Sequence, residues 1–345
     1  MLTNLLRPFL LARLLSGISV SALVVVALFV AVRVLRRFRL GETSEGQLLL
    51  ERRAELVATL VQAALGMAIF NLALTVLAAD HLSQAIRGAM CAYGVFSSND
   101  LGFLPLGTSA LAALACVLWL TLHRLDLALP DPRLTRRKFI ALFIVGPLVL
   151  LDLWATLAWA FDLDLGVVAT CCSASIDQAG TQTFGAAPMG GRVTLYYAAL
   201  ATLALAVLAL FALYRRPGRV RAWTAAALAA LSVALCLPAI VGYVAPHMYE
   251  NPRHLCPFCL LHADALGIGW PLFGALFLAG SLGLSLVVLE SQRRRAADDA
   301  IVSALEARVA KVAMLGFVIT FVLCVLPVAR YAWISGGAPL FGGPG

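Results

Sequence analysis

Residues 192–214 read RVTLYYAALATLALAVLALFALY, and only the leading Arg192 is charged. As an α-helix, an apolar run of this length crosses about 30 Å of hydrocarbon. Similar runs occur at 17–35, 55–79, 104–123, 139–161, 222–244, 268–289 and 312–334. The sequence therefore predicts an all-α polytopic membrane bundle of about eight transmembrane helices.

The composition of the whole chain agrees with a lipid environment. Of its 345 residues, 62% are hydrophobic and 13% are charged, and the mean hydropathy is +0.93. A soluble domain needs a larger charged surface. The formal net charge is +8, but Lys and Arg stand in short clusters between the apolar runs, as expected for helix ends at a membrane and not for a nucleic-acid surface. We expect the lipid bilayer, and no nucleic acid, as a partner.

The distribution of basic residues predicts the orientation of the helices. Loops after the first, third, fifth and seventh runs are rich in Arg, which places them in the cytoplasm by the positive-inside rule. The other loops, 80–103, 162–191 and 245–267, are poor in Lys and Arg and should face outward, together with both termini. These outer loops hold five of the eight cysteines: Cys91, Cys171, Cys172, Cys256 and Cys259. We expect a bacterial inner membrane protein with these cysteines toward the periplasm or exterior.

Two halves of the sequence resemble one another. The segments MCAYGV at 90–95, NDLGF at 99–103 and PLG at 105–107 are echoed by LCPFCL at 255–260, ADALGI at 263–268 and PLFG at 271–274. Two parallel four-helix repeats, 1–165 and 166–345, would explain this echo, with the Cys-x-x-Cys in an outer loop of the second repeat. Chance similarity between Leu- and Gly-rich segments is the alternative.

Cys256-Pro257-Phe258-Cys259 is the sharpest motif in the chain. Two thiols at this spacing can close and reopen a small disulfide ring. If Pro257 is the first residue of a helix, Cys256 occupies its cap, where the positive helix end favours a thiolate. The same cysteines could also serve as metal ligands, or as small apolar residues that cap a span.

The metal alternative draws on two neighbouring histidines. His254, Cys256, Cys259 and His262 lie within one short segment, and Cys with His is a familiar zinc ligand set. The spacing is crowded for one closed tetrahedral site. In the redox interpretation, His254 and His262 act as proton donors, and Trp270 belongs either to an aromatic belt or to a pocket for a quinone headgroup.

The remaining outer cysteines extend the redox hypothesis. A ring between the adjacent Cys171 and Cys172 is strained, so this pair is expected to exchange with a distant thiol or to bind a soft metal. A permanent disulfide to Cys91 is the alternative for it, and Cys91 could pair with either motif. By contrast, Cys116, Cys236 and Cys324 stand among apolar residues of the spans and should carry no chemistry.

Two charged residues near the first and fourth runs need an explanation. Asp152 falls inside a predicted span, where a carboxylate requires a polar interior or a partner. Arg13 precedes the first span, and segment 1–16 is expected to lie along the membrane interface.

Cys256-Pro-Phe-Cys259, followed by Leu-Leu, resembles the quinone-coupled thiol oxidases of the DsbB family. Cys91, Val95-Phe96-Ser97-Ser98 and Leu101-Gly102-Phe103-Leu104-Pro105 look like the first-loop motif of the vitamin K epoxide reductase family. The resemblance implies a quinone beside Cys256 and Cys259, with Cys171 and Cys172 relaying electrons from a thioredoxin-like outer partner. The resemblance covers two short patches of the chain. The DsbB family has an Arg just after its Cys-x-x-Cys motif, and this chain lacks that Arg and has His262 in the same region.

Three hypotheses follow from the sequence. The first is a membrane thiol-disulfide oxidoreductase that exchanges electrons between outer protein thiols and a membrane quinone. The second is a protein that binds or transports a soft metal ion such as copper, zinc or mercury through outward Cys and His residues. The third is a scaffold whose outer disulfides brace its loops.

Overall fold

Eight long helices dominate the part of the chain that the computed structural model describes, residues 6–37, 45–131, 133–169 and 189–341. They are α2 (Pro8–Arg37), α3 (Glu45–Ser83), α5 (Leu104–Ala128), α6 (Thr135–Asp162), α8 (Met189–Arg215), α9 (Arg219–Ala239) with its continuation, α11 (Gly269–Ala296) and α12 (Asp299–Ile334). Each is long and apolar enough to cross a membrane. The predicted all-α polytopic bundle is confirmed, and the chain is an integral membrane protein.

Several helices begin before their apolar runs. Helix α2 starts at Pro8 and not near residue 17, since proline suits the first turn of a helix. Arg13 therefore lies inside the first helix and is fully buried, which corrects the expectation of an interfacial segment 1–16. Helix α12 likewise starts at Asp299, well before residue 312.

Five short elements accompany the long helices. They are α4 (Ala92–Phe96), the π-helical η1 (Ile240–Val244), α10 (Ala245–Met248), and the 3₁₀ turns η2 (Phe258–Leu261) and η3 (Ala263–Ala265). The π turn follows Pro238, which lacks an N–H for the regular helical ladder. Helices α9, η1 and α10 thus form one continuous span, Arg219–Met248.

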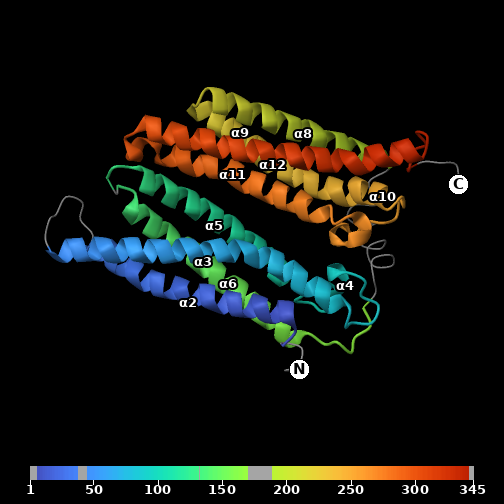
Figure 1. Cartoon of the computed structure of the whole chain (residues 1–345), viewed down its shortest axis with the longest axis horizontal. Helices are drawn as coiled ribbons and strands as arrows, with labels where there is room; N and C mark the ends of the chain where they lie inside the picture. Colours follow the sequence, from blue (N-terminus) through green and yellow to red (C-terminus); the bar gives the residue numbers. More distant parts are fainter. Residues whose placement is uncertain (1–5, 38–44, 132, 170–188, 342–345) are drawn as a thin grey trace. The chain divides into compact units, whose positions relative to one another are not determined.

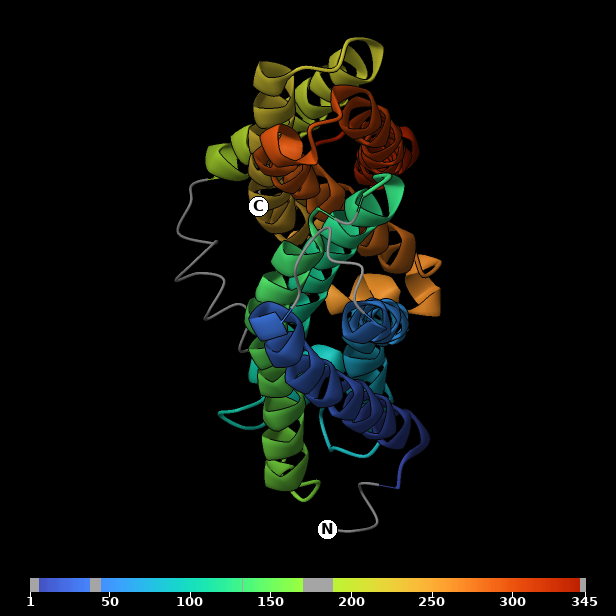
Figure 2. The ribbon, with the colours of Figure 1, turned by 90° about the vertical axis from the view of Figure 1, so that its left-hand side faces the viewer.

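By their contacts, the residues form two compact units. The first contains 1–87, 95–169 and 291–302, and the second contains 88–94, 170–290 and 303–345. In the first unit α2 packs on α3, α3 on α5, α5 on α6, and α6 on α2, which closes a ring of four helices. Both views show α2 beside α3 (Figures 1 and 2).

The second unit is also a four-helix arrangement (Figure 1). Helix α8 packs on α9, and small residues bring α9 close to α11 and α11 close to α12, at Gly283 opposite Ala229 and Gly316 opposite Ala279. The Tyr196 hydroxyl of α8 donates to the Cys324 carbonyl of α12 at 3.3 Å. The ring is thereby closed within this unit, while the tandem duplication stays a prediction.

A buried ion pair organises the interior of the first unit. The Arg13 guanidinium donates to Asp152 at 2.7 Å and to the hydroxyls of Thr75 and Thr156 at 2.8 and 2.9 Å. Ser109 donates to the other Asp152 oxygen at 2.6 Å. Asp152 therefore has the partner that its place in a span requires, and all four helices of this unit contribute to the network.

Candidate functional site: a cluster of three thiols

Three of the predicted outer cysteines come together in the second unit. The sulfur atoms of Cys91, Cys256 and Cys259 all lie within 4.8 Å of one another, and Cys91 Sγ is 3.5 Å from Cys256 Sγ. Segment 88–94 belongs to the same unit as Cys256 and Cys259, so this thiol cluster is built inside one unit.

A tight turn before Cys91 positions this residue in the cluster. Gly88 has a φ of +83°, a conformation that favours glycine. Cys91 then precedes the short helix α4, and its carbonyl accepts a hydrogen bond from the Gly94 N–H at 3.0 Å. A side chain at Gly94 would meet Ala89 at 2.9 Å, so this turn requires a small residue there.

Of the other two cysteines, Cys259 lies on a 3₁₀ turn and Cys256 lies just before that turn, not at the start of a long helix. Pro257 is the N-cap of the four-residue η2, and Cys256 precedes it. The membrane helix α11 begins only at Gly269. Leu266 and Gly267 both have positive φ, so no regular helix continues from the 3₁₀ turn into α11. The expectation that Cys256 caps a helix is therefore wrong, and a turn this short offers no helix dipole to favour a thiolate.

The close approach of α11 to this turn depends on a glycine. A side chain at Gly269 would lie 2.8 Å from the Leu260 carbonyl carbon. The Trp270 indole N–H donates to the Leu261 carbonyl at 3.1 Å. Trp270, a predicted quinone-binding residue, thus ties the Cys-x-x-Cys turn to the beginning of α11.

The cluster is enclosed by apolar side chains. Cys91 and Cys256 are fully buried, and Cys259 keeps 8% of its surface exposed. Leu255, Tyr93, Val241, Tyr249 and Phe258 pack against the three thiols. Access from solvent is therefore greatest at Cys259.

Tyr249 and His254 form a stacked pair beside the thiols. Their ring centroids are 4.0 Å apart at an interplanar angle of 22°, and the Tyr249 hydroxyl donates to the Cys259 carbonyl at 2.8 Å. The buried Nε2 atom of His254 has no hydrogen-bond partner among the described residues.

Burial perturbs both rings. It raises the pKa of Tyr249 well above the ordinary value, reinforced by the nearby Cys259, so the phenol stays protonated and keeps its hydrogen bond. Burial also lowers the pKa of His254, against a smaller opposing effect of Cys91. A neutral imidazole at pH 7 follows from that direction.

The other candidates are placed differently. His262 ends the η2 turn, where its N–H donates to the Cys259 carbonyl at 3.1 Å, and neither His254 nor His262 is among the three residues whose ligand atoms cluster. Cys171 and Cys172 lie outside the described residues. Cys116, Cys236 and Cys324 are buried within α5, α9 and α12.

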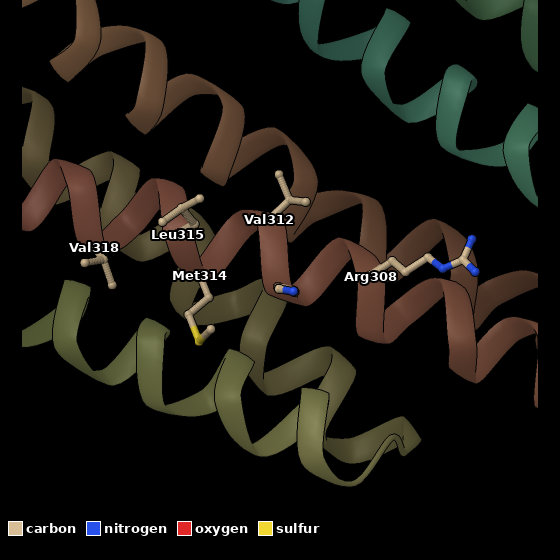
Figure 3. A pocket seen from close by; sticks show the side chains of 6 residues that line it. Arg308, Val312, Met314, Leu315 and Val318 are labelled. Atoms are coloured by element: carbon tan, nitrogen blue, oxygen red, sulfur yellow. The ribbon is translucent and has the colours of Figure 1, made fainter.

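A pocket of about 470 Å³ opens along α12 (Figure 3). Its lining consists of the basic residues Arg308 and Lys311 and the apolar residues Val312, Met314, Leu315 and Val318. Long basic side chains beside exposed apolar residues are typical of a membrane helix near the lipid headgroups. None of the predicted site residues lines this pocket.

Comparisons with known proteins do not assign a function. The chain matches no protein-family model, no curated protein and no solved structure.

Proposed function

We propose that the chain is a membrane thiol-disulfide oxidoreductase with its reactive centre at Cys91, Cys256 and Cys259. The observation that carries the proposal is the proximity of three sulfurs, all within 4.8 Å. Exchange proceeds by attack of a thiolate on a disulfide sulfur. A third thiol beside a Cys-x-x-Cys pair supplies an attacking group without a large movement of the chain.

The proposed reaction has two halves. In the first, two thiols of an outer, thioredoxin-like protein reduce the Cys256–Cys259 disulfide by way of a mixed disulfide, and the partner leaves oxidised. In the second, the two resulting thiols pass two electrons and two protons to a membrane quinone, which becomes a quinol, and the disulfide forms again. Cys171 and Cys172 would relay electrons between the partner and this centre.

Cys91 has a defined part in this scheme. Its thiolate attacks Cys256 of the Cys256–Cys259 disulfide, so that a Cys91–Cys256 bond forms and the Cys259 thiolate is released. The 3.5 Å separation of the Cys91 and Cys256 sulfurs supports this step. The thiols of the partner then reduce the Cys91–Cys256 disulfide, and Cys259, the most exposed of the three, passes two electrons to the quinone together with Cys256.

A variant series tests the proposal in proteoliposomes that contain a quinone and a reduced dithiol protein. We expect Cys256→Ser to abolish oxidation of the dithiol. Cys236→Ser, a matched change of a buried thiol in the same unit, should leave the rate unchanged. Circular dichroism shows whether both variants fold. Undiminished turnover in a folded Cys256→Ser protein would overturn the proposal.

A further inference from the structure

We propose that the reduced thiol cluster binds one thiophilic divalent d¹⁰ ion, such as Zn(II) or Cd(II), through Cys91, Cys256 and Cys259. The ligand set differs from the one that the sequence offered, because Cys91 joins the two cysteines in place of His254 and His262. This binding is separate from the proposed redox reaction, although it uses the same sulfurs.

The spacing of the sulfurs agrees with one shared ion. A Zn–S bond is about 2.3 Å long, so three thiolates around one ion lie about 3.8–4.0 Å from one another in tetrahedral or trigonal geometry. The observed separations are 3.5 Å for Cys91 and Cys256 and at most 4.8 Å for the set. Shifts well under 1 Å would bring all three sulfurs onto one ion.

Charge and burial select the class of ion. Three thiols that bind a divalent ion release three protons and leave a complex of net charge −1, whereas a monovalent ion would leave −2. Burying charge in apolar surroundings is costly, and two of the three thiols are fully buried. The divalent ion is therefore favoured, and thiolate ligands select a soft ion over Mg²⁺ or Ca²⁺.

The site leaves one coordination position open. Zn(II) is normally four-coordinate, and the three cysteines supply three ligands. The partial exposure of Cys259 gives the open side access to solvent, so a water molecule or an external thiol would complete the coordination. Metal binding and disulfide formation then exclude one another, because the same sulfurs cannot do both.

The test is a titration of the full chain, purified in detergent, reduced and free of metal, with Cd(II) under anaerobic conditions. We expect one ion per chain, an ultraviolet thiolate-to-metal charge-transfer band and release of about three protons per ion. Cys171→Ser/Cys172→Ser should bind equally well, as should Cys236→Ser. Cys91→Ser should weaken binding by at least about tenfold, and Cys259→Ala should do the same.

The outcomes separate this inference from the proposed function. Absent binding, or binding that survives Cys91→Ser and Cys259→Ala, would overturn the three-thiolate site, whatever the dithiol oxidation assay gives. Binding lost in Cys171→Ser/Cys172→Ser would overturn it too, since the ion would then sit elsewhere. Intact binding with no oxidation of the dithiol would instead leave the metal site standing and remove the redox proposal.

Discussion

Arg13 and Asp152 show how a single pair of residues can determine the interior of a membrane bundle. Both side chains are buried, and their charged atoms are 2.7 Å apart. Removing one member leaves an uncompensated buried charge, which typically costs about 3–5 kcal/mol, whereas replacing both with apolar residues can be nearly neutral. The pair is thus expected to be strongly coupled.

A double-mutant cycle measures that coupling. We predict that Asp152→Leu alone lowers the free energy of unfolding by about 3–5 kcal/mol and that Arg13→Met/Asp152→Leu recovers most of the loss. Unfolding by sodium dodecyl sulfate in mixed micelles, followed by circular dichroism, provides the measurement. Arg133→Ala, which breaks an exposed pair with Asp131, is the control and should cost less than about 1 kcal/mol. Additive effects of the two core substitutions would contradict the pairing.

Tyr249 illustrates a residue whose role depends on one hydrogen bond. Tyr249→Phe removes the hydroxyl that donates a hydrogen bond to the Cys259 carbonyl. Such a hydrogen bond contributes about 0.5–1.5 kcal/mol to stability. We predict a two- to tenfold faster reaction of Cys259 with a maleimide, because local opening of the turn becomes more frequent. Mass spectrometry of the labelled peptide gives the rate, and Tyr197→Phe, at an exposed position, should not change it. Equal rates in wild type and Tyr249→Phe would show that the hydrogen bond does not hold the turn.

At this scale, the sequence predicts the three clustered thiols as candidates and leaves open which cysteine motif Cys91 approaches. Cys256 and Cys259 are apparent from their spacing, whereas the approach of Cys91 to Cys256 depends on contacts between segments far apart in the chain. The sequence does not predict Arg13 as a core residue, because the apolar run begins only at residue 17, whereas helix α2 begins at Pro8.

Small residues lie where α9 and α11 approach one another. A side chain at Gly283 would lie 2.3 Å from the Ala229 Cβ atom, but nothing lies within 4 Å of the corresponding position at Gly274 on the same helix. Small residues permit two helix backbones to approach this closely, and the close packing then stabilises the pair.

The matched substitutions Gly283→Ala and Gly274→Ala test this packing. We predict that Gly283→Ala costs about 1–3 kcal/mol through overpacking and that Gly274→Ala is neutral or slightly stabilising, since alanine favours the helix. Thermal unfolding of the two variants in the same detergent compares them directly. Equal melting temperatures would rule out a tight contact between α9 and α11 at Gly283.

The elements also show where sequence reasoning ends. Apolar runs predicted all eight long helices, because hydrocarbon thickness dictates their length. Cys256-Pro257 resembles the cap and first residue of a helix, but the segment that follows is the 3₁₀ turn Phe258–Leu261. Leu266 adopts a left-handed conformation, and α11 begins only after it, at Gly269. Leucine rarely adopts this conformation, so the sequence does not predict it.

For the whole molecule, the orientation in the membrane is a prediction of the positive-inside rule. Leu266, in a predicted outer loop, and Val220, at the predicted cytoplasmic start of α9, are both strongly exposed. We predict that a membrane-impermeant maleimide labels Leu266→Cys in intact spheroplasts and labels Val220→Cys only after permeabilisation. The reverse pattern would place the thiol cluster on the cytoplasmic face, away from any secreted thiol partner.

The central claim for the molecule is that its thiol cluster opens and closes a disulfide, and disulfide mapping by mass spectrometry tests it most directly. Membranes are equilibrated in thiol/disulfide buffers over a range of potentials, quenched with acid and alkylated. We expect a reversible disulfide between two of Cys91, Cys256 and Cys259, while Cys116, Cys236 and Cys324 remain thiols throughout. Three thiols that stay reduced at every potential, or a Cys91–Cys256 bond that never opens, would contradict it.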